Sequence, residues 1–211
     1  ILEMPEGFMS LCNKDLPMDS TDAFRYLSSR GIGRREILKW KIGYCKEGRY
    51  AGRIIIPSFD IEGDLNYFIA RSYVGHTRRY LNPPADRDLV FNELNIDWDE
   101  PVVLVEGVFD AIAAGFNAIP ILGSTLREQS RLFQAIAIHD TPVYMALDHD
   151  AEKKAESIIK SMLKYDLEVH KVPIDEADVS EMGEKEFKER LTCSREIKSD
   201  MYFFEKVHQN I

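Results

Sequence analysis

Cysteine is scarce in this sequence, with three among 211 residues. Cys12, Cys45 and Cys193 lie far apart and form no Cys-x-x-Cys pair, so the chain encodes neither a disulfide framework nor a zinc ribbon. We therefore expect no zinc in this chain and a reducing, cytoplasmic setting.

Long apolar runs are also missing. No window approaches the roughly 18 continuous apolar residues of a membrane span, and the N-terminus lacks the basic-then-apolar order of a signal peptide. These absences predict a soluble protein that is not exported and has no membrane partner. The chain opens with Ile1 rather than Met, which favours an excised piece of a longer protein.

Positive charge is in the minority, but it is concentrated. The formal net charge is −9, which argues against a protein that coats nucleic acid over its whole surface. The segment from Thr21 to Arg79 nevertheless has 12 Lys and Arg against 6 Asp and Glu, a local charge of +6. Any surface for a polyanion is therefore expected in the first half of the chain.

The first half predicts two helices and a β-hairpin. Capping-type residues precede the first apolar periodicity, and runs rich in β-branched and aromatic residues flank a polar turn. The expected order is a tail or linker at 1–18, helices at 19–31 and 34–40, strands at 52–59 and 65–72 joined by a turn at 60–64, and an irregular segment to residue 98.

From Pro101 onward, short apolar runs alternate with longer helical stretches, which is typical of an α/β fold with a mostly parallel sheet. An α+β subdomain at 19–98 would thus precede the parallel βαβ subdomain at 99–179, with a helical segment at 180–211. The expected strands are 101–106, 117–122, 142–148 and 167–172, and the expected helices are 108–115, 126–137, 151–164, 183–191 and 196–208.

Acidic residues end two of the predicted strands. Glu106 follows Val-Val-Leu-Val, and Asp148 and Asp150 follow Val-Tyr-Met-Ala-Leu. A single Asp in such a place usually caps the next helix. Carboxylates that converge at the carboxyl edge of a sheet repel one another unless a cation neutralises them, so the combination favours a metal site.

The ligand types select the metal. Further acids, Asp175, Glu176 and Asp178, follow the last predicted strand, and no Cys or His joins the set. His149 lies between two of the acids, and strand alternation would point it to the opposite face, so we assign it a structural role. Hard oxygen ligands favour Mg²⁺ or Mn²⁺, and two such ions can support phosphoryl transfer on any of several substrates.

The segments Val105 to Ile112, Asn117 to Ser124 and Leu147 to Ala151 resemble the motif series of the TOPRIM domain, which primases, topoisomerases and some nucleases share. The preceding half narrows the choice. Gly52-Arg-Ile-Ile-Ile-Pro, Ile69-Ala-Arg71, Arg79-Tyr-Leu-Asn-Pro83, and the lead-in Tyr26 to Ile32 with Ile42 to Tyr44 resemble the RNA polymerase domain of bacterial and phage primases. The resemblance covers about residues 20–190.

That resemblance implies roles for particular residues. Glu106, Asp148 and Asp150 would be catalytic and would bind two Mg²⁺ or Mn²⁺ ions, with Asp178 at the outer ion. The residues implied for template and nucleotide phosphates are Arg53, Arg71, Arg78, Arg79 and Asn82. A solvated hairpin face is the alternative for any one of these cations, and Tyr67, Phe68, Tyr73 and Tyr80 are expected in the core more often than stacked on bases.

The chain departs from the family pattern at three places. Asn92 stands where a Lys is common, Ser180 replaces the second Asp of the third acidic motif, and Glu152 to Lys154 replace a Gly at a helix start. These changes put one cationic contact and the outer metal in question.

The resemblance therefore implies the catalytic core of a DNA primase in a bacterial cell or phage-infected host. Its expected partners are single-stranded DNA, ribonucleoside triphosphates, a replicative helicase and a zinc-binding domain outside this chain. Two alternatives stay open: a TOPRIM-type nuclease that uses the same acids, and a non-catalytic module that binds nucleic acid. A topoisomerase would need a further domain with a reactive Tyr.

Overall fold

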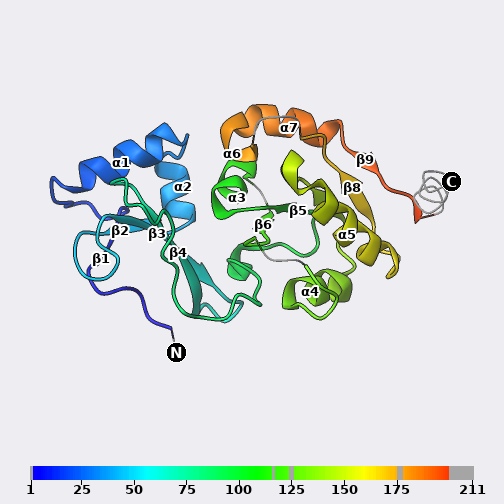
Figure 1. The fold of residues 1–211 in the computed structure, drawn as a ribbon, viewed down its shortest axis with the longest axis horizontal. Helices are drawn as coiled ribbons and strands as arrows, with labels where there is room; N and C mark the ends of the chain where they lie inside the picture. Colours follow the sequence, from blue (N-terminus) through cyan, green and yellow to red (C-terminus); the bar gives the residue numbers. More distant parts are fainter. Residues whose placement is uncertain (1, 116, 124–125, 175–177, 200–211) are drawn as a thin grey trace. The chain divides into compact units, whose positions relative to one another are not determined.

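The structure is a computed structural model that describes residues 2–115, 117–123, 126–174 and 178–199. The chain divides into two compact units, one up to Leu94 and one from Asn95 onward. Both mix helices with strands (Figure 1), so the predicted α/β class is confirmed. The finer division at 98/99 and 179/180 stays a prediction.

The first unit is built on a four-stranded antiparallel sheet of order β1-β2-β3-β4. The expected hairpin is present as β3 and β4, which pair along their length with Ile56 opposite Ile69. Asp60 closes the turn by accepting a hydrogen bond from the Asp64 backbone N–H at 2.8 Å. The strands are β1 Phe8–Ser10, β2 Gly43–Cys45, β3 Arg53–Phe59 and β4 Leu65–Ser72.

The expectation of a tail over residues 1–18 is wrong at β1, which pairs antiparallel with β2. Three residues are too few to show a periodicity, so only the tertiary pairing reveals the strand. The two expected helices are α1 Ser20–Ser29 and α2 Arg34–Lys39, which lie along one side of the sheet in Figure 1. Their buried apolar residues are Ala23, Leu27 and Ile37.

The second unit contains a five-stranded sheet of order β6-β5-β7-β8-β9, in which β5 to β8 are parallel. The predicted βαβαβαβ order is confirmed. The strands are β5 Val102–Val105, β6 Ala118–Pro120, β7 Val143–Met145, β8 Val169–Lys171 and β9 Arg195–Glu196.

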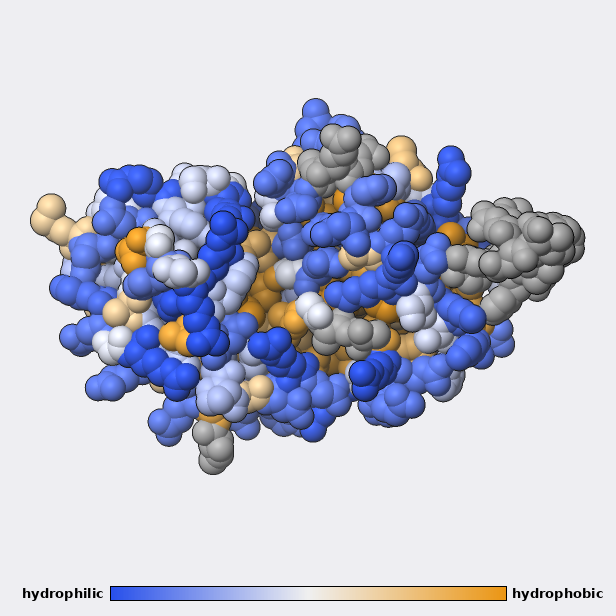
Figure 2. Space-filling view, viewed as in Figure 1, coloured by the Kyte–Doolittle hydropathy of each residue, from blue (hydrophilic) through white to orange (hydrophobic). Residues whose placement is uncertain are grey.

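The helices of this unit pack on the sheet and on one another. α3 contacts α6 and α7, and α5 contacts β8. On the face drawn in Figure 2, hydrophilic residues cover most of the surface. The elements are η1 Glu93–Asn95, which spans the unit boundary, then α3 Val108–Ala114, α4 Arg131–His139, η2 His149–Ala151, α5 Glu152–Leu163, α6 Val179–Met182 and α7 Glu184–Thr192.

Two boundaries differ from expectation. Helix α4 begins at Arg131 rather than 126, because Ser130 caps it by accepting a hydrogen bond from the Phe133 N–H at 3.4 Å. Glu196 lies in β9, which pairs antiparallel with β8, so the helix expected from 196 does not begin there. Residues 200–208 of that prediction lie outside the described residues. Within the described ranges, no helix is long and apolar enough to cross a bilayer.

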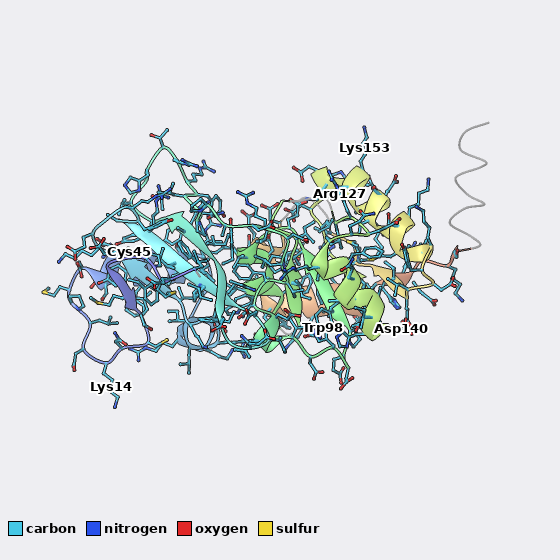
Figure 3. The ribbon with its side chains drawn as sticks, turned by 90° about the horizontal axis from the view of Figure 1, so that it is seen from below. Lys14, Cys45, Trp98, Arg127, Asp140 and Lys153 are labelled. Carbon is cyan, nitrogen blue, oxygen red and sulfur yellow. The ribbon has the colours of Figure 1, made fainter. Side chains whose placement is uncertain are left out.

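Asn117 fixes the entry to β6. Its side-chain nitrogen donates to the carbonyls of Asp97, Glu100 and Pro101 at 2.7 to 3.1 Å, and its Oδ1 accepts from the Asp97 N–H at 2.9 Å. The residue is buried and has a φ of 55°, which Asn tolerates better than most residues. Trp98 of the same connection is labelled in Figure 3.

We expect Asn117→Ala to lower the free energy of unfolding of the second unit by about 3 kcal/mol, because several buried backbone groups lose their partner. Denaturant unfolding followed by circular dichroism measures this. The exposed Asn95→Ala in the same unit is the control and should change stability by less than about 0.5 kcal/mol. An equal effect of both variants would contradict the assignment.

Candidate metal centre at the edge of the parallel sheet

The strand order places Glu106 and Asp148 together. The chain leaves β5 to form β6 on one side and then crosses to form β7 on the other, so β5 and β7 are the topological switch point of the sheet. Leu104 lies opposite Met145, and the Ala146 N–H donates to the Leu104 carbonyl at 2.9 Å. The residues that follow both strands therefore share one edge.

Asp110 is a member of this cluster that the sequence analysis did not single out. It is buried in the first turn of α3, where its Oδ2 accepts from the Gly107 N–H at 2.9 Å and its Oδ1 from the Ser180 N–H at 3.1 Å. A side chain in the first turn of a helix leans back toward the preceding strand. The four-residue spacing from Glu106 was the available signal.

The carboxylates destabilise one another's charge. Burial raises the pKa of Asp148 to about 7, with repulsion from Asp110, Asp178, Glu106 and Asp150 adding to it. Burial also raises the pKa of Asp110, against the lowering effect of its hydrogen bonds with Ser180 and Gly107. Five acids thus share one electrostatic environment.

Two oxygens of the cluster are buried without a hydrogen-bond partner, Glu106 Oε1 and Asp148 Oδ1. Asp148 precedes η2 but makes no side-chain capping bond, so the capping alternative does not apply to it. Buried anionic oxygens without donors are costly and suit a hard cation such as Mg²⁺ or Mn²⁺.

The site is not a finished metal cage. Across the described ranges, no three His, Cys, Asp or Glu side chains lie close enough to form one, and Asp175 and Glu176 fall outside these ranges. Asp150 is exposed in η2, and Asp178 occupies the N-cap position of α6 without a side-chain cap bond. The oxygen donors of these acids fit a hard divalent ion in their chemistry.

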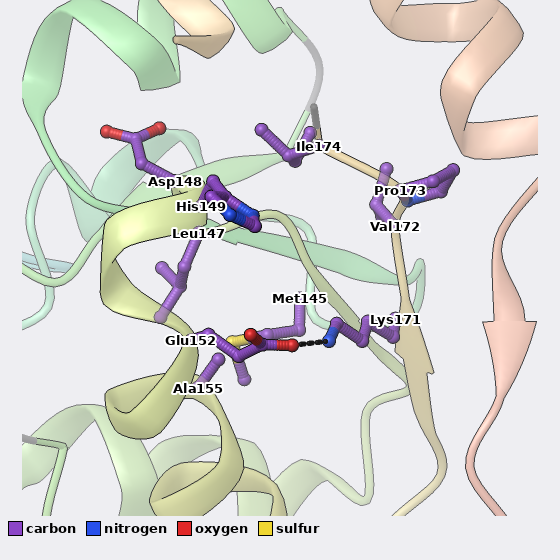
Figure 4. Close-up of a pocket in the computed structure, with 10 residues that line it drawn as sticks. All are labelled: Met145, Leu147, Asp148, His149, Glu152, Ala155, Lys171, Val172, Pro173 and Ile174. Atoms are coloured by element: carbon purple, nitrogen blue, oxygen red, sulfur yellow. Dashed lines mark hydrogen bonds and ion pairs between the residues drawn. The ribbon is translucent and has the colours of Figure 1, made fainter. Parts of the chain in front are cut away.

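A pocket of about 250 Å³ lies beside the cluster, between the start of α5 and the end of β8. Met145, Leu147 and Val172 are apolar members of its wall, and Lys171 pairs with Glu152 across it at 3.1 Å. In Figure 4 the Asp148 carboxylate and the His149 ring point in different directions. His149 is exposed and lies in η2 rather than in a strand, so the alternation on which its predicted orientation depends does not apply.

Lys154 is a cation built into the acidic edge. Its Nζ lies 3.7 Å from Glu106 Oε1, and both side chains are about three-quarters buried, with exposures of 22% and 27%. Lys154 thus brings a counter-charge to a proposed metal ligand. Lys153 next to it is exposed and points away from α5 in Figure 3.

The structure gives the five predicted phosphate contacts different surroundings, all in the first unit. The Arg53 guanidinium is buried, and Asn82 Oδ1 accepts from the Ala70 N–H at 3.2 Å. Arg71 donates to the Tyr26 hydroxyl at 3.0 Å and lies over the Tyr80 ring at 4.7 Å. The side chains of Arg78 and Arg79 are the exposed members of this group.

The four aromatic residues that we expect mostly in the core differ in burial, and Tyr73 among them is partly buried. Tyr67 and Phe68 are fully buried and belong to the core, whereas Tyr80 is 43% exposed. Asn92, which stands where the primases commonly have a Lys, is also buried, with a φ of 58° and its N–H donating to Ser58 Oγ at 2.7 Å. Its side chain is a neutral amide, so it supplies no cationic contact.

The raised pKa of Asp148 predicts a pH dependence of stability. Without metal, the folded chain keeps a proton there up to about pH 7, whereas the unfolded chain loses it near the ordinary value of 3.8. The stability of the second unit should therefore fall as pH rises from about 4 to about 7 and stay low above that. Asp148→Asn should be more stable than the parent by about 1–2 kcal/mol at pH 8, after allowance for solvent screening, and equal to it below pH 4.

Denaturant unfolding at pH 3.5, 6 and 8 measures this difference, with the exposed Asp140→Asn as control (Figure 3). Asn keeps the left-handed φ of 51° at residue 140, so that variant should show no pH-dependent gain. A parent protein as stable as Asp148→Asn at pH 8 would contradict the repulsion.

The Lys154 pair predicts an effect on metal affinity. We expect Lys154→Met to raise the affinity for Mn²⁺ by ~5-fold, because the ion no longer competes with an ammonium group for Glu106. Titration calorimetry measures the affinity, and Lys153→Met is the control for removing a nearby charge. Equal changes in the two variants would show a general charge effect instead.

The comparisons with known proteins point to one group. No protein-family model matches the chain. A DNA primase from Thermotoga maritima is 24% identical over 216 residues, covering 79% of this chain and 38% of that protein. The chain thus spans well under half the length of this curated relative.

Solved structures resemble it more extensively. The zinc-binding and RNA polymerase domains of the Aquifex aeolicus primase give a TM-score of 0.70 at 22% identity, covering 86% of this chain and 57% of that one. A DnaG primase catalytic domain bound to single-stranded DNA gives 0.72 at 20% identity, covering 92% and 78%. A DNA primase domain from Pseudomonas aeruginosa gives 0.72 at 20%, covering 93% and 78%. The chain therefore resembles a bacterial DNA primase in sequence and has the fold of the DnaG catalytic core, the RNA polymerase domain with its TOPRIM subdomain.

Proposed function

We propose that this chain is the catalytic core of a DNA primase, which joins ribonucleotides on a single-stranded DNA template. The observation that carries the proposal is the acidic edge at the switch point of the sheet, where Glu106 and Asp148 each keep a buried oxygen without a hydrogen bond and only Glu106 has an ammonium group, that of Lys154, at 3.7 Å among the described contacts. That edge occurs in a fold shared with primase catalytic cores. The proposed setting is the cytoplasm of a bacterial or phage-infected cell.

In this proposal Glu106, Asp148, Asp150 and Asp178 hold two Mg²⁺ or Mn²⁺ ions. When bound, such a pair stabilises the attacking and the leaving oxygen of a nucleotidyl transfer. The chain itself must orient these ligands. Asp110 does part of this by joining the start of α3 to the start of α6, because it accepts hydrogen bonds from Gly107, next to Glu106, and from Ser180, two residues after Asp178.

Whether the Asp148 carboxylate binds a proton or a metal ion depends on the pH and on the metal concentration. Because the pKa of Asp148 is near 7, protons and metal ions compete for its carboxylate around neutrality. Lys154 adds a second competitor at Glu106. We infer that metal occupancy, and with it activity, rises with pH between about 6 and 8.

The remaining parts of the activity are assigned to partners. Ribonucleoside triphosphates and single-stranded DNA are the proposed substrates, and the exposed Arg78 and Arg79 are the proposed contacts to phosphates. Site selection would come from a zinc-binding domain and template supply from a replicative helicase, neither of which this chain is proposed to encode.

The test is incorporation of labelled ribonucleotides on single-stranded DNA with Mg²⁺ or Mn²⁺, with a pre-annealed primer as a second substrate that bypasses initiation. We expect short RNA products from the parent and a loss of at least about 100-fold in Asp148→Ala and Asp148→Asn, because each removes a metal ligand. Asp140→Asn is the matched control and should retain the parent rate.

The same assay separates the alternatives. DNA cleavage that depends on Asp148 and needs no nucleotides would assign the chain to the nucleases. DNA binding that is indifferent to metal, with neither synthesis nor cleavage on either substrate, would make it a binding module. Normal synthesis by Asp148→Ala would overturn the metal assignment itself.

A further inference from the structure

A closed loop projects from the first sheet between β4 and Tyr80. Its neck is held by the antiparallel bridge of Arg71 and Tyr80 and by a hydrogen bond from the Ser72 N–H to the Arg79 carbonyl at 2.9 Å. Inside the loop, Ser72 Oγ accepts from the His76 N–H at 3.0 Å and lies 3.1 Å from His76 Nδ1. Residues 74–80 are exposed.

The Arg53 side chain contacts the end of this loop that is closed by the Arg71–Tyr80 bridge. Its side chain starts on β3, and the residue is only 5% exposed. Nη1 donates to the Arg79 carbonyl at 3.1 Å and Nη2 to the Arg78 carbonyl at 2.9 Å. The two ends of the guanidinium fork thus hold two consecutive peptide groups.

The partners of Arg53 are unusual for a buried cation, because both are neutral carbonyls. Burial lowers the pKa of Arg53, and the positive charge of Arg78 lowers it further. A buried charge facing a like charge is unfavourable, so this arrangement is expensive to keep for stability alone. The two hydrogen bonds from Arg53 fix the backbone at Arg78 and Arg79, whose side chains are exposed.

Gly52 supports the same loop without any charge. Its φ is 67°, and its carbonyl accepts from the Tyr73 N–H at 3.1 Å. A Cβ at this position would lie 2.7 Å from Val74 Cγ2 and 3.1 Å from His76 Cε1. The loop therefore rests directly on the Gly52-Arg53 pair.

We propose that Arg53 is a positioning residue for a polyanion-binding loop, and that the phosphodiester backbone of single-stranded nucleic acid contacts Arg78 and Arg79 rather than Arg53. The inference rests on the proposed function for its ligand. A loop whose backbone is already ordered loses less conformational entropy on binding, and its two cations stay in place for neighbouring phosphates. Direct contact by Arg53 is disfavoured because its side chain is buried and both ends of its fork already donate to backbone carbonyls.

The experiment measures binding of a fluorescent dT oligonucleotide to the full chain at several salt concentrations. Arg53→Lys keeps the charge but loses the fork, and Gly52→Ala keeps every charge but pushes on the loop. We expect each to weaken binding by about 5- to 20-fold and to lower the salt slope by about one phosphate contact, as Arg79→Ala does. A variant that only loosened the fold would leave the slope unchanged.

A double-mutant cycle gives the sharper result. If Arg53 acts through the loop, Arg53→Lys should have no further effect in a chain that already carries Arg78→Ala and Arg79→Ala. Additive losses would show that Arg53 contacts the phosphate itself and would overturn the inference, as would parent-like binding by Arg53→Lys.

Hydrogen exchange of residues 73–79 keeps the test independent of folding and of the proposed function. Exchange there should accelerate in Arg53→Lys and Gly52→Ala while the β3 and β4 amides stay protected. If the parent binds no oligonucleotide at all, the nucleic-acid ligand of both proposals is wrong. If it binds and primes but the cycle is additive, only the role of Arg53 is wrong.

Discussion

The parallel pairing of β5 with β7 is the constraint on which the acidic edge depends. Strand β6 is added on one side of β5 and β7 on the other, so the order in which strands are added to the sheet reverses at this pair. The residues that follow both strands therefore meet at one edge. The strands are short and fully or largely buried, so their register is fixed by apolar packing on both faces. A shift of one residue would turn the whole set of core side chains to the other face and separate Glu106 from Asp148.

The edge created in this way stores repulsion. Asp110 is buried among other acids and is tolerated because two backbone N–H groups donate to it, whereas Asp148 has no such compensation at one oxygen. The same group that holds α3 to α6 therefore raises the pKa of its neighbour. Such clustering of perturbed acids is typical of functional sites, where stability is given up for a charge arrangement. Lys154 partly offsets the repulsion by pairing with Glu106.

In the first unit, the arginines of the positive segment differ from one another in burial and in partners. The positive segment is not a uniform basic face, since Arg53 lies inside, Arg71 is held by Tyr26 and Tyr80, and Arg78 and Arg79 are exposed. The inner arginine binds backbone carbonyls, and the outer ones are those proposed to bind phosphates. Arginines from the same basic segment thus have different surroundings, because a guanidinium is equally able to bind a carbonyl or a phosphate.

The sequence by itself determined the α/β class, the hairpin of β3 and β4, the alternation of β5 to β8 with helices, and the placement of acids after two strands. These features depend on local patterns: β-branched runs, polar turns and the change of hydrophobic period. The similarity of motif order also identified the fold that the solved structures confirm. The roles of the individual site residues stay predictions.

Only the tertiary structure decided the rest. Strand β1 exists because β2 offers it an edge, and β9 because β8 does, and neither is long enough to carry a periodicity of its own. Asp110 and Lys154 join the acidic edge through packing across α3, α5 and α6, which no spacing rule specifies completely. The burial of Arg53 follows from the course of a loop more than 20 residues later in the chain. In each case the deciding contact is distant in sequence, and the short local pattern is compatible with several partners.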